Sequence, residues 1–112
     1  MAEIKSTVSD LDVALKLTQL YHSARDRKLD FNLTYKTVKR LITNKKCFYT
    51  GVKFQPEGPL SRSIDRIDTT RGYVEGNVVA CTVDINGKKA NLTVPEIEML
   101  FKSIIKHKNR NK

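Results

Sequence analysis

The chain has 112 residues, and 21 Lys and Arg against 12 Asp and Glu give it a formal net charge of +9. This length suits one domain, and 39% hydrophobic residues are too many for a disordered polyelectrolyte. No apolar run approaches the roughly 20 residues that span a bilayer, and the opening MAEIKSTVSD lacks the apolar stretch of a secretory signal. We therefore expect a cytoplasmic, single-domain protein over residues 1–112 with no membrane partner. Its positive charge favours a polyanion such as nucleic acid.

Two helices are predicted in the first part of the chain, which we expect to form a helical flank over residues 9–44. Residues 10–27 carry apolar residues at helical spacing, and Ser9 is a good N-cap before them. The main stripe of that helix comprises Val13, Leu17, Leu20 and Ala24. A second helix is predicted over 34–44 with Thr34 as its cap; its inward-facing residues are Val38, Leu41 and Ile42.

The middle of the chain, about 47–80, has the Gly and Pro content of turns between short extended segments. A strand is expected around Ile64–Ile67, a polar loop over 69–76, and a second strand from Asn77. A short helix follows over about 81–90. The last helix, about 94–107, begins with a capping box formed by Thr93 and Glu96.

Two oxygen-bearing side chains are expected to meet in this middle segment. Asp65 lies near the end of the first strand, and Asn86 lies 21 residues later on the short helix. A strand, loop, strand and helix of this size can bring the two side chains together. Carboxylate and amide oxygens suit Mg²⁺, which takes few protein ligands and keeps several waters.

The phrase SIDRID, followed by RGYVEGNVVAC and NGKK, resembles the HNH endonucleases, and in particular their small phage and mobile-element members. The resemblance covers about residues 47–89. It implies an α+β protein with a ββα-metal core over about 47–90, N-terminal helices and a C-terminal helix. It also implies hydrolysis of DNA phosphodiester bonds with Mg²⁺ or Mn²⁺ as cofactor.

The resemblance assigns roles to individual residues. Asp65 and Asn86 correspond to the metal ligands, and Asn77 corresponds to an asparagine that braces the loop through backbone hydrogen bonds without touching the metal. Lys89 corresponds to a lysine that meets a DNA phosphate. Without the resemblance, we would interpret Asp65 as an exposed strand-end carboxylate paired with Arg62 or Arg66. Asn77 and Asn86 would be interpreted as turn or cap residues.

The chain departs from the family where most members have a general-base histidine, because it has Arg66 there. A guanidinium stays protonated and cannot accept a proton from water, although it can bind the scissile phosphate. The general base would then be either a metal-bound hydroxide or Asp68. An exposed aspartate is a poor base at neutral pH unless its pKa is raised.

The cysteine content also departs from the family, since many HNH domains carry Cys-x-x-Cys pairs for structural zinc. Here each of the two Cys-x-x-Cys positions keeps only its first cysteine, Cys47 or Cys81. The second cysteine of each pair is replaced by Thr50 or Asp84. Such a set makes a poor tetrahedral zinc site. We therefore expect two buried thiols and no structural zinc.

Basic residues gather in two places. Those around the motif are expected to bind the DNA backbone and comprise Arg62, Arg66, Arg71, Lys88 and Lys89. The last twelve residues hold five basic and no acidic side chains and form either a solvated helix end or a phosphate-contacting arm. Within the loop, Gly72 and Gly76 are expected to provide positive φ, and Tyr73 to pack.

These patterns favour a metal-dependent DNA endonuclease or nicking enzyme with low or shape-based specificity, since no sequence-reading module is apparent. The alternative is a catalytically inactive HNH-like regulator that binds DNA or a protein, which the missing histidine favours. A basic RNA-associated protein would explain the charge but not the motif. The sequence does not predict the oligomeric state.

Overall fold

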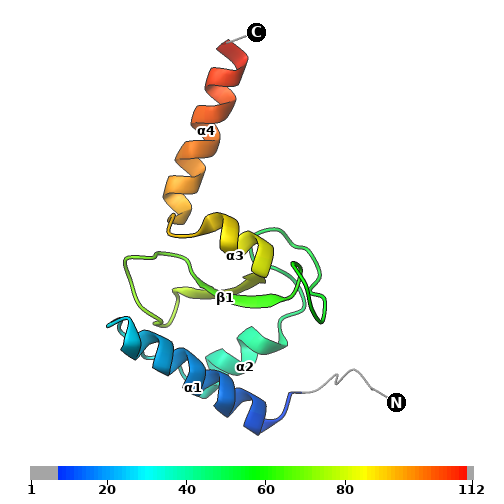
Figure 1. Cartoon of the computed structure of the whole chain (residues 1–112), viewed down its shortest axis with the longest axis vertical. Helices are drawn as coiled ribbons and strands as arrows, with labels where there is room; N and C mark the ends of the chain where they lie inside the picture. The colour runs from blue at the N-terminus through cyan, green and yellow to red at the C-terminus, as the bar shows by residue number, and fades with distance from the viewer. Residues whose placement is uncertain (1–7, 111–112) are drawn as a thin grey trace.

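The computed structural model describes residues 8–110, so the last two residues of the basic tail lie outside the described residues. Four helices and a two-stranded antiparallel sheet make up this part of the chain (Figure 1). In chain order the elements are α1 (Asp10–Asp26), α2 (Tyr35–Thr43), β1 (Arg62–Arg66), β2 (Val78–Thr82), α3 (Val83–Lys89) and α4 (Val94–Arg110). The α+β fold class predicted from the sequence is confirmed.

The two N-terminal helices begin at their predicted caps. The Ser9 hydroxyl accepts a hydrogen bond from the Asp12 N–H, and the Asp12 carboxylate accepts one from the Ser9 N–H, forming a capping box. The Thr34 hydroxyl accepts a hydrogen bond from the Thr37 N–H in the same way. Both helices pack their apolar faces under the sheet, in a core to which Val13, Leu20, Val38, Leu41, Tyr73, Val78 and Ala80 contribute.

The sheet is the centre of the molecule and β2 is buried along its whole length. Asp65 pairs with Val79 and Arg66 with Val78 in the antiparallel register. Because α1 and α2 cover one face of the sheet and α3 covers the other, successive side chains of β2 are buried on opposite sides (Figure 1). The Thr82 hydroxyl accepts from the Ile85 N–H, so α3 begins as soon as β2 ends.

The loop between the strands is fastened to the N-terminal helices. The Glu75 carboxylate accepts hydrogen bonds from the Thr34 N–H at 3.3 Å and from the Thr37 hydroxyl at 2.5 Å. This places a negative charge at the N-terminus of α2, where the helix dipole favours it. The Asn32 side chain also accepts from the Glu75 N–H. The helical flank and the loop therefore hold each other in place.

Gly72 is required for a reason that differs from the expected positive φ. Its φ is ordinary, but a Cβ at this position would lie 2.1 Å from the carbonyl oxygen of Asp30. The neighbouring Tyr73 N–H donates to that same carbonyl at 2.9 Å. Gly76 does have the expected positive φ, at +84°. Gly72 is thus a point of close backbone approach between the loop and the helical flank.

The last helix is the least expected feature of the fold. Thr93 and Glu96 form the predicted capping box. The helix then extends away from the body along its longest axis, which spans 55 Å (Figure 1). Its apolar residues beyond Ile97 are largely exposed instead of joining the core. Among residues 8–110, no helix is long and apolar enough to cross a membrane.

The close approach at Gly72 predicts the effect of adding one methyl group. We expect Gly72→Ala to lower the free energy of unfolding by about 1–3 kcal/mol, because the loop must separate from Asp30. Urea denaturation followed by circular dichroism measures the change.

The matched control for this variant is Gly87→Ala. Gly87 lies in α3 with nothing within 4 Å of the added Cβ, so alanine there should raise stability by about 0.5–1 kcal/mol. Equal effects of the two variants would contradict the importance of the Asp30 contact.

Candidate active site

Asp65 is buried near the end of β1, with only 6% of its surface exposed. The Tyr49 hydroxyl donates a 2.6 Å hydrogen bond to its Oδ2. Burial, followed by this hydrogen bond, raises the pKa of Tyr49 well above its usual range, so the phenol stays protonated and serves as a donor. Asp65 is therefore an interior carboxylate and not the exposed strand-end group paired with arginine.

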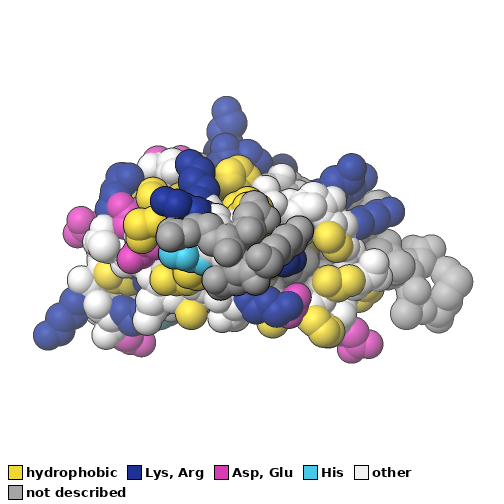
Figure 2. Space-filling view, turned by 90° about the horizontal axis from the view of Figure 1, so that it is seen from above, with side chains coloured by type: hydrophobic (Ala, Val, Ile, Leu, Met, Phe, Trp, Pro, Cys, Tyr) yellow, Lys and Arg dark blue, Asp and Glu magenta, His cyan; other side chains and the backbone are white. Residues whose placement is uncertain are grey.

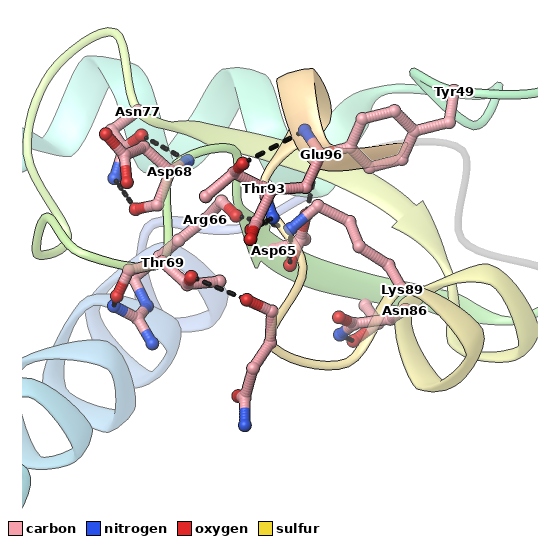
Figure 3. Close-up of polar contacts among 12 residues, drawn as sticks. Tyr49, Asp65, Arg66, Asp68, Thr69, Asn77, Asn86, Lys89, Thr93 and Glu96 are labelled. Atoms are coloured by element: carbon pink, nitrogen blue, oxygen red, sulfur yellow. Dashed lines mark hydrogen bonds and ion pairs between the residues drawn. The ribbon is translucent and has the colours of Figure 1, made fainter. Parts of the chain in front are cut away.

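Lys89, the last residue of α3, neutralises Asp65. Its Nζ lies 3.1 Å from Oδ2 and 3.4 Å from Oδ1 of Asp65, and it donates a 2.9 Å hydrogen bond to the Arg66 carbonyl (Figure 3). Lys89 is only 4% exposed. The structure thus differs from the expectation that Lys89 meets a DNA phosphate. A lysine at the end of an amphipathic helix would normally leave its ammonium in solvent. Here the ammonium is buried because the Asp65 carboxylate has no other counter-charge.

Asn86 and Asp65 line one small polar pocket, as the sequence predicts for a shared site. The pocket has a volume of about 170 Å³. Asn86 Nδ2 donates to the Ser63 hydroxyl at 2.7 Å, while its Oδ1 makes no hydrogen bond within residues 8–110. Besides these two residues, Arg27, Ile64, Arg66, Thr69, Tyr73, Ala90 and Asn91 line the pocket.

Two guanidinium groups reach this pocket. Arg66 is buried, and its Nη1 donates to the carbonyls of Thr69 and Arg71 at 2.9 and 2.7 Å. Arg27 follows the last residue of α1, and its Nη1 donates to the Tyr73 hydroxyl at 3.2 Å. Tyr73 itself packs in the core, as expected. With two arginines and one already neutralised carboxylate, the pocket has a net positive charge that suits a phosphate.

Sequence reasoning missed Arg27, which lies 38 residues before Asp65. The chain passes from α1 to the core through a turn in which Lys28 has a positive φ of 57°. This turn brings Asp30 to Gly72 and the end of α1 to Tyr73. In the sequence, Arg27 is simply a basic residue at a helix C-terminus, where the helix dipole favours a positive charge, so nothing local indicates a role in the pocket.

Asn77 braces the loop with both atoms of its amide. Its Oδ1 accepts from the Asp68 N–H at 2.9 Å, and its Nδ2 donates to the carbonyls of Asp68 and Gly72 at 3.1 and 2.9 Å. The side chain is 2% exposed and does not line the pocket. This arrangement agrees with the bracing role that the family resemblance implies.

Asp68 does not line the pocket and is engaged elsewhere. Its Oδ1 accepts hydrogen bonds from the hydroxyl and the N–H of Thr70 at 2.6 and 2.9 Å. The Thr70 hydroxyl, followed by the Thr70 N–H, holds the pKa of Asp68 below its ordinary value. A carboxylate so stabilised is a weaker proton acceptor, which disfavours Asp68 as the general base.

The remaining basic residues expected to bind DNA lie outside the pocket. Arg62, at the far end of β1, bonds to the Asn44 carbonyl and lies over the Phe54 ring at 4.8 Å. Lys88 forms an exposed ion pair with Asp84 at 3.3 Å, and Arg71 is exposed on the loop. Figure 2 shows Lys and Arg side chains at the left, top and right of the view, with acidic side chains among them. On the face seen there, positive charge is not gathered into one patch.

Cys47 and Cys81 are free, buried thiols. Burial, followed by the negative charge of Asp65, raises the pKa of Cys81 to about 12. Residues 47–52 form a tight turn closed by backbone hydrogen bonds from Cys47 N–H to the Val52 carbonyl and from Gly51 N–H to the Cys47 carbonyl. Among residues 8–110, no cluster of three or more His, Cys, Asp or Glu side chains could hold a metal ion.

The oxygens in the pocket nevertheless fit a magnesium ion in kind. Asp65 supplies a carboxylate and Asn86 an amide oxygen, and the polar pocket has room for water. Mg²⁺ needs no more than one or two such protein ligands. The charge adds one condition, because the Lys89 ammonium already contacts both oxygens of Asp65. A divalent cation must therefore compete with Lys89 for the carboxylate.

The fold has a counterpart among solved structures. The HNH restriction endonuclease PacI, described as rare-cutting, superposes with a TM-score of 0.61 over 85% of this chain and 78% of that chain, at 20% sequence identity. The chain has an HNH-like fold.

A sequence relative comes from a bacteriophage. It is an uncharacterized 29.0 kDa protein encoded in the dda-modA intergenic region of Enterobacteria phage T4, and it is 33% identical over 84 residues. That alignment covers 73% of this chain, which spans about one third of the phage protein's length. A comparison with models of protein families finds no match.

The buried Asp65–Lys89 pair predicts a large difference between two adjacent lysines. We expect Lys89→Met to lower the free energy of unfolding by about 3–5 kcal/mol, because Asp65 would remain buried without its counter-charge. Lys88→Met, on the exposed face of the same helix, should change it by less than about 0.5 kcal/mol. Urea denaturation measures both.

The double variant Asp65→Asn/Lys89→Met tests the cause of this loss. It should recover much of the stability that Lys89→Met alone loses, because no charge remains buried. Additive losses in the double variant would contradict the ion-pair explanation.

Proposed function

We propose that the chain is a metal-dependent DNA endonuclease or nicking enzyme that hydrolyses phosphodiester bonds with low or shape-based specificity. The observation that carries the proposal is the pocket itself. It combines hard oxygen donors from Asp65 and Asn86 with two guanidinium groups, from Arg27 and Arg66, within one HNH-like fold. A metal and a phosphate can thus be held side by side.

Asp65 and Asn86 would hold Mg²⁺ or Mn²⁺. Such an ion, when bound, polarises the scissile phosphate and stabilises charge on the leaving oxygen. Lys89 would balance the charge of Asp65 in the absence of the ion. Because the Lys89 side chain is long and unbranched, its ammonium would be able to leave the carboxylate to a bound cation, and the Tyr49 hydroxyl would continue to orient Asp65.

The arginines would position the DNA. Arg66 is held rigidly by two backbone carbonyls of the loop, so its remaining N–H groups have a fixed direction at the pocket. Arg27 is held more loosely by Tyr73 and can move toward a phosphate. Neither group can accept a proton from water. Their role in the proposed reaction is to bind the phosphate and to stabilise its developing negative charge.

One observation favours the alternative of a catalytically inactive DNA- or protein-binding regulator. The only carboxylate lining the pocket within the described chain is already paired with a buried lysine, and the pocket is lined by no histidine. A protein that binds phosphate through Arg27 and Arg66 would need no metal. The experiments below separate the two functions.

Metal-dependent nicking of supercoiled plasmid is the direct test of the enzyme. We expect nicks in Mg²⁺ or Mn²⁺ and none with EDTA. Asn86→Ala should reduce the nicking rate by more than about 10–100-fold, because a metal-ligand oxygen is lost. The matched control is Ser63→Ala, which removes the hydrogen bond to Asn86 Nδ2 and leaves the oxygen intact.

The outcomes distinguish the functions. Nicking that survives in Asn86→Ala would contradict the proposed metal site. A purified protein that shifts DNA in a gel but does not cut it with any divalent ion would establish the binding protein instead.

A second pair of variants tests phosphate binding at the pocket. We expect Arg27→Ala to reduce nicking by about 100-fold, since one donor to the phosphate is removed. Arg25→Ala removes the same charge from the same helix, but Arg25 pairs with Asp26 in solvent and does not line the pocket. Equal losses in the two variants would indicate general electrostatic attraction and would contradict a specific role for Arg27.

A further inference from the structure

The helix α4 carries an apolar stripe with nothing packed against it in the described part of the chain. Beyond Ile97 the stripe consists of Leu100, Phe101, Ile104 and Ile105, at spacings of three and four residues. These four side chains are 42–64% exposed. Such a stripe on a helix that extends away from the body indicates a surface that another helix covers (Figure 1).

The stripe continues into a groove at the base of the helix. The groove has a volume of about 410 Å³ and lies where α3 and the following turn meet α4. Its apolar lining includes Tyr49, Ile85, Leu92, Val94, Ile97 and Leu100. A helix laid along α4 would therefore bury its own side chains against the arm and, at one end, against the body.

The charges along α4 indicate which helix fits. The N-terminal half carries Glu96 and Glu98, and the C-terminal half carries Lys102, Lys106 and Lys108. A second copy of α4 running antiparallel places the acidic half of one helix beside the basic half of the other. A parallel copy would place like charges together, which is unfavourable. We propose that two copies of this chain form a two-fold dimer through antiparallel α4 helices.

The pairing would bring particular residues together. Glu98 and Lys102 lie on the same edge of the apolar stripe, one on each side of Phe101 in the sequence. In an antiparallel pair centred on Leu100, Glu98 of each copy faces Lys102 of the other. Phe101 packs near its own symmetry mate, and Ile104 and Ile105 reach toward the groove at the base of the other helix.

The area available is that of a weak, reversible dimer. With about 150–200 Å² for a fully buried large side chain, the four exposed residues and the groove offer about 300–500 Å² of apolar surface per copy. Two copies would bury about 600–1000 Å² of apolar surface, which is below the about 1,200 Å² of stable interfaces and matches a weak, reversible association. The dimer does not depend on the proposed nuclease activity, because none of the stripe residues beyond Ile97 lines the pocket that holds Asp65.

The test is the mass of the full chain in solution. We expect analytical ultracentrifugation to show a monomer–dimer equilibrium at about 1–100 µM protein. Phe101→Glu should raise the dissociation constant of the dimer by about tenfold or more, because a charge enters the centre of the interface. Met99→Glu makes the same kind of change on the opposite side of the helix, where Met99 is 65% exposed, and should leave the dimer intact.

Charge exchange tests the antiparallel direction. Glu98→Lys and Lys102→Glu should each weaken the dimer by about 2–10-fold, and the double variant should restore it, since two symmetric pairs are broken and re-formed. All of these positions are exposed, so circular dichroism and thermal melting should show that each variant folds.

Three results would overturn the proposal. A monomer at every concentration would mean that another chain or segment covers the stripe. Equal dissociation by Phe101→Glu and Met99→Glu would place the interface elsewhere. Failure of the double charge exchange to restore the dimer would exclude the antiparallel arrangement.

Discussion

The loop between the two strands depends on a single buried amide. The Asn77 side chain accepts a hydrogen bond from Asp68 and donates to the carbonyls of Asp68 and Gly72, so that residues 68–77 form a closed loop. This closed loop presents the carbonyls of Thr69 and Arg71 to the Arg66 guanidinium. It also brings Gly72 against Asp30. The position of the guanidinium and the attachment of the helical flank both follow from that one set of hydrogen bonds, which have no water to replace them.

The charge of the Asp65 carboxylate is balanced within the chain. A buried carboxylate needs a partner, and a divalent cation or an ammonium can provide it. Here Lys89 does so within the chain, and the same ammonium caps the carbonyl of Arg66. The fold is therefore compatible with a stable protein whether or not a cation is bound. Under the proposed function, a bound cation would replace Lys89 as the partner of Asp65.

The sequence predicted the parts of this structure that arise from local chemistry. Ser9, Thr34 and Thr93 capped helices where their side chains indicated, and the spacing from Asp65 to Asn86 correctly placed both residues at one pocket. What it could not provide came from long-range packing. The Lys89 side chain is buried because Asp65 is buried. Arg27 lines the pocket because of the way α1 packs against the rest of the protein. An amphipathic pattern also predicted α4 without revealing that its apolar face would remain outside the core. Helical periodicity identifies a face to be covered but not the surface that covers it.

The pocket is assembled from segments that are distant along the chain. Arg27 comes from the end of the first helix, Asp65 and Arg66 from a strand, Thr69 from the loop, and Asn91 from the turn before the last helix. The Thr69 hydroxyl donates to the Asn91 carbonyl at 2.8 Å, which closes the wall between the loop and that turn. During synthesis on the ribosome, the pocket can be completed only after Asn91 has been added, because its lining extends from Arg27 to Asn91. Under the proposed function, a product that ends before Asn91 would therefore lack a complete site for cutting DNA.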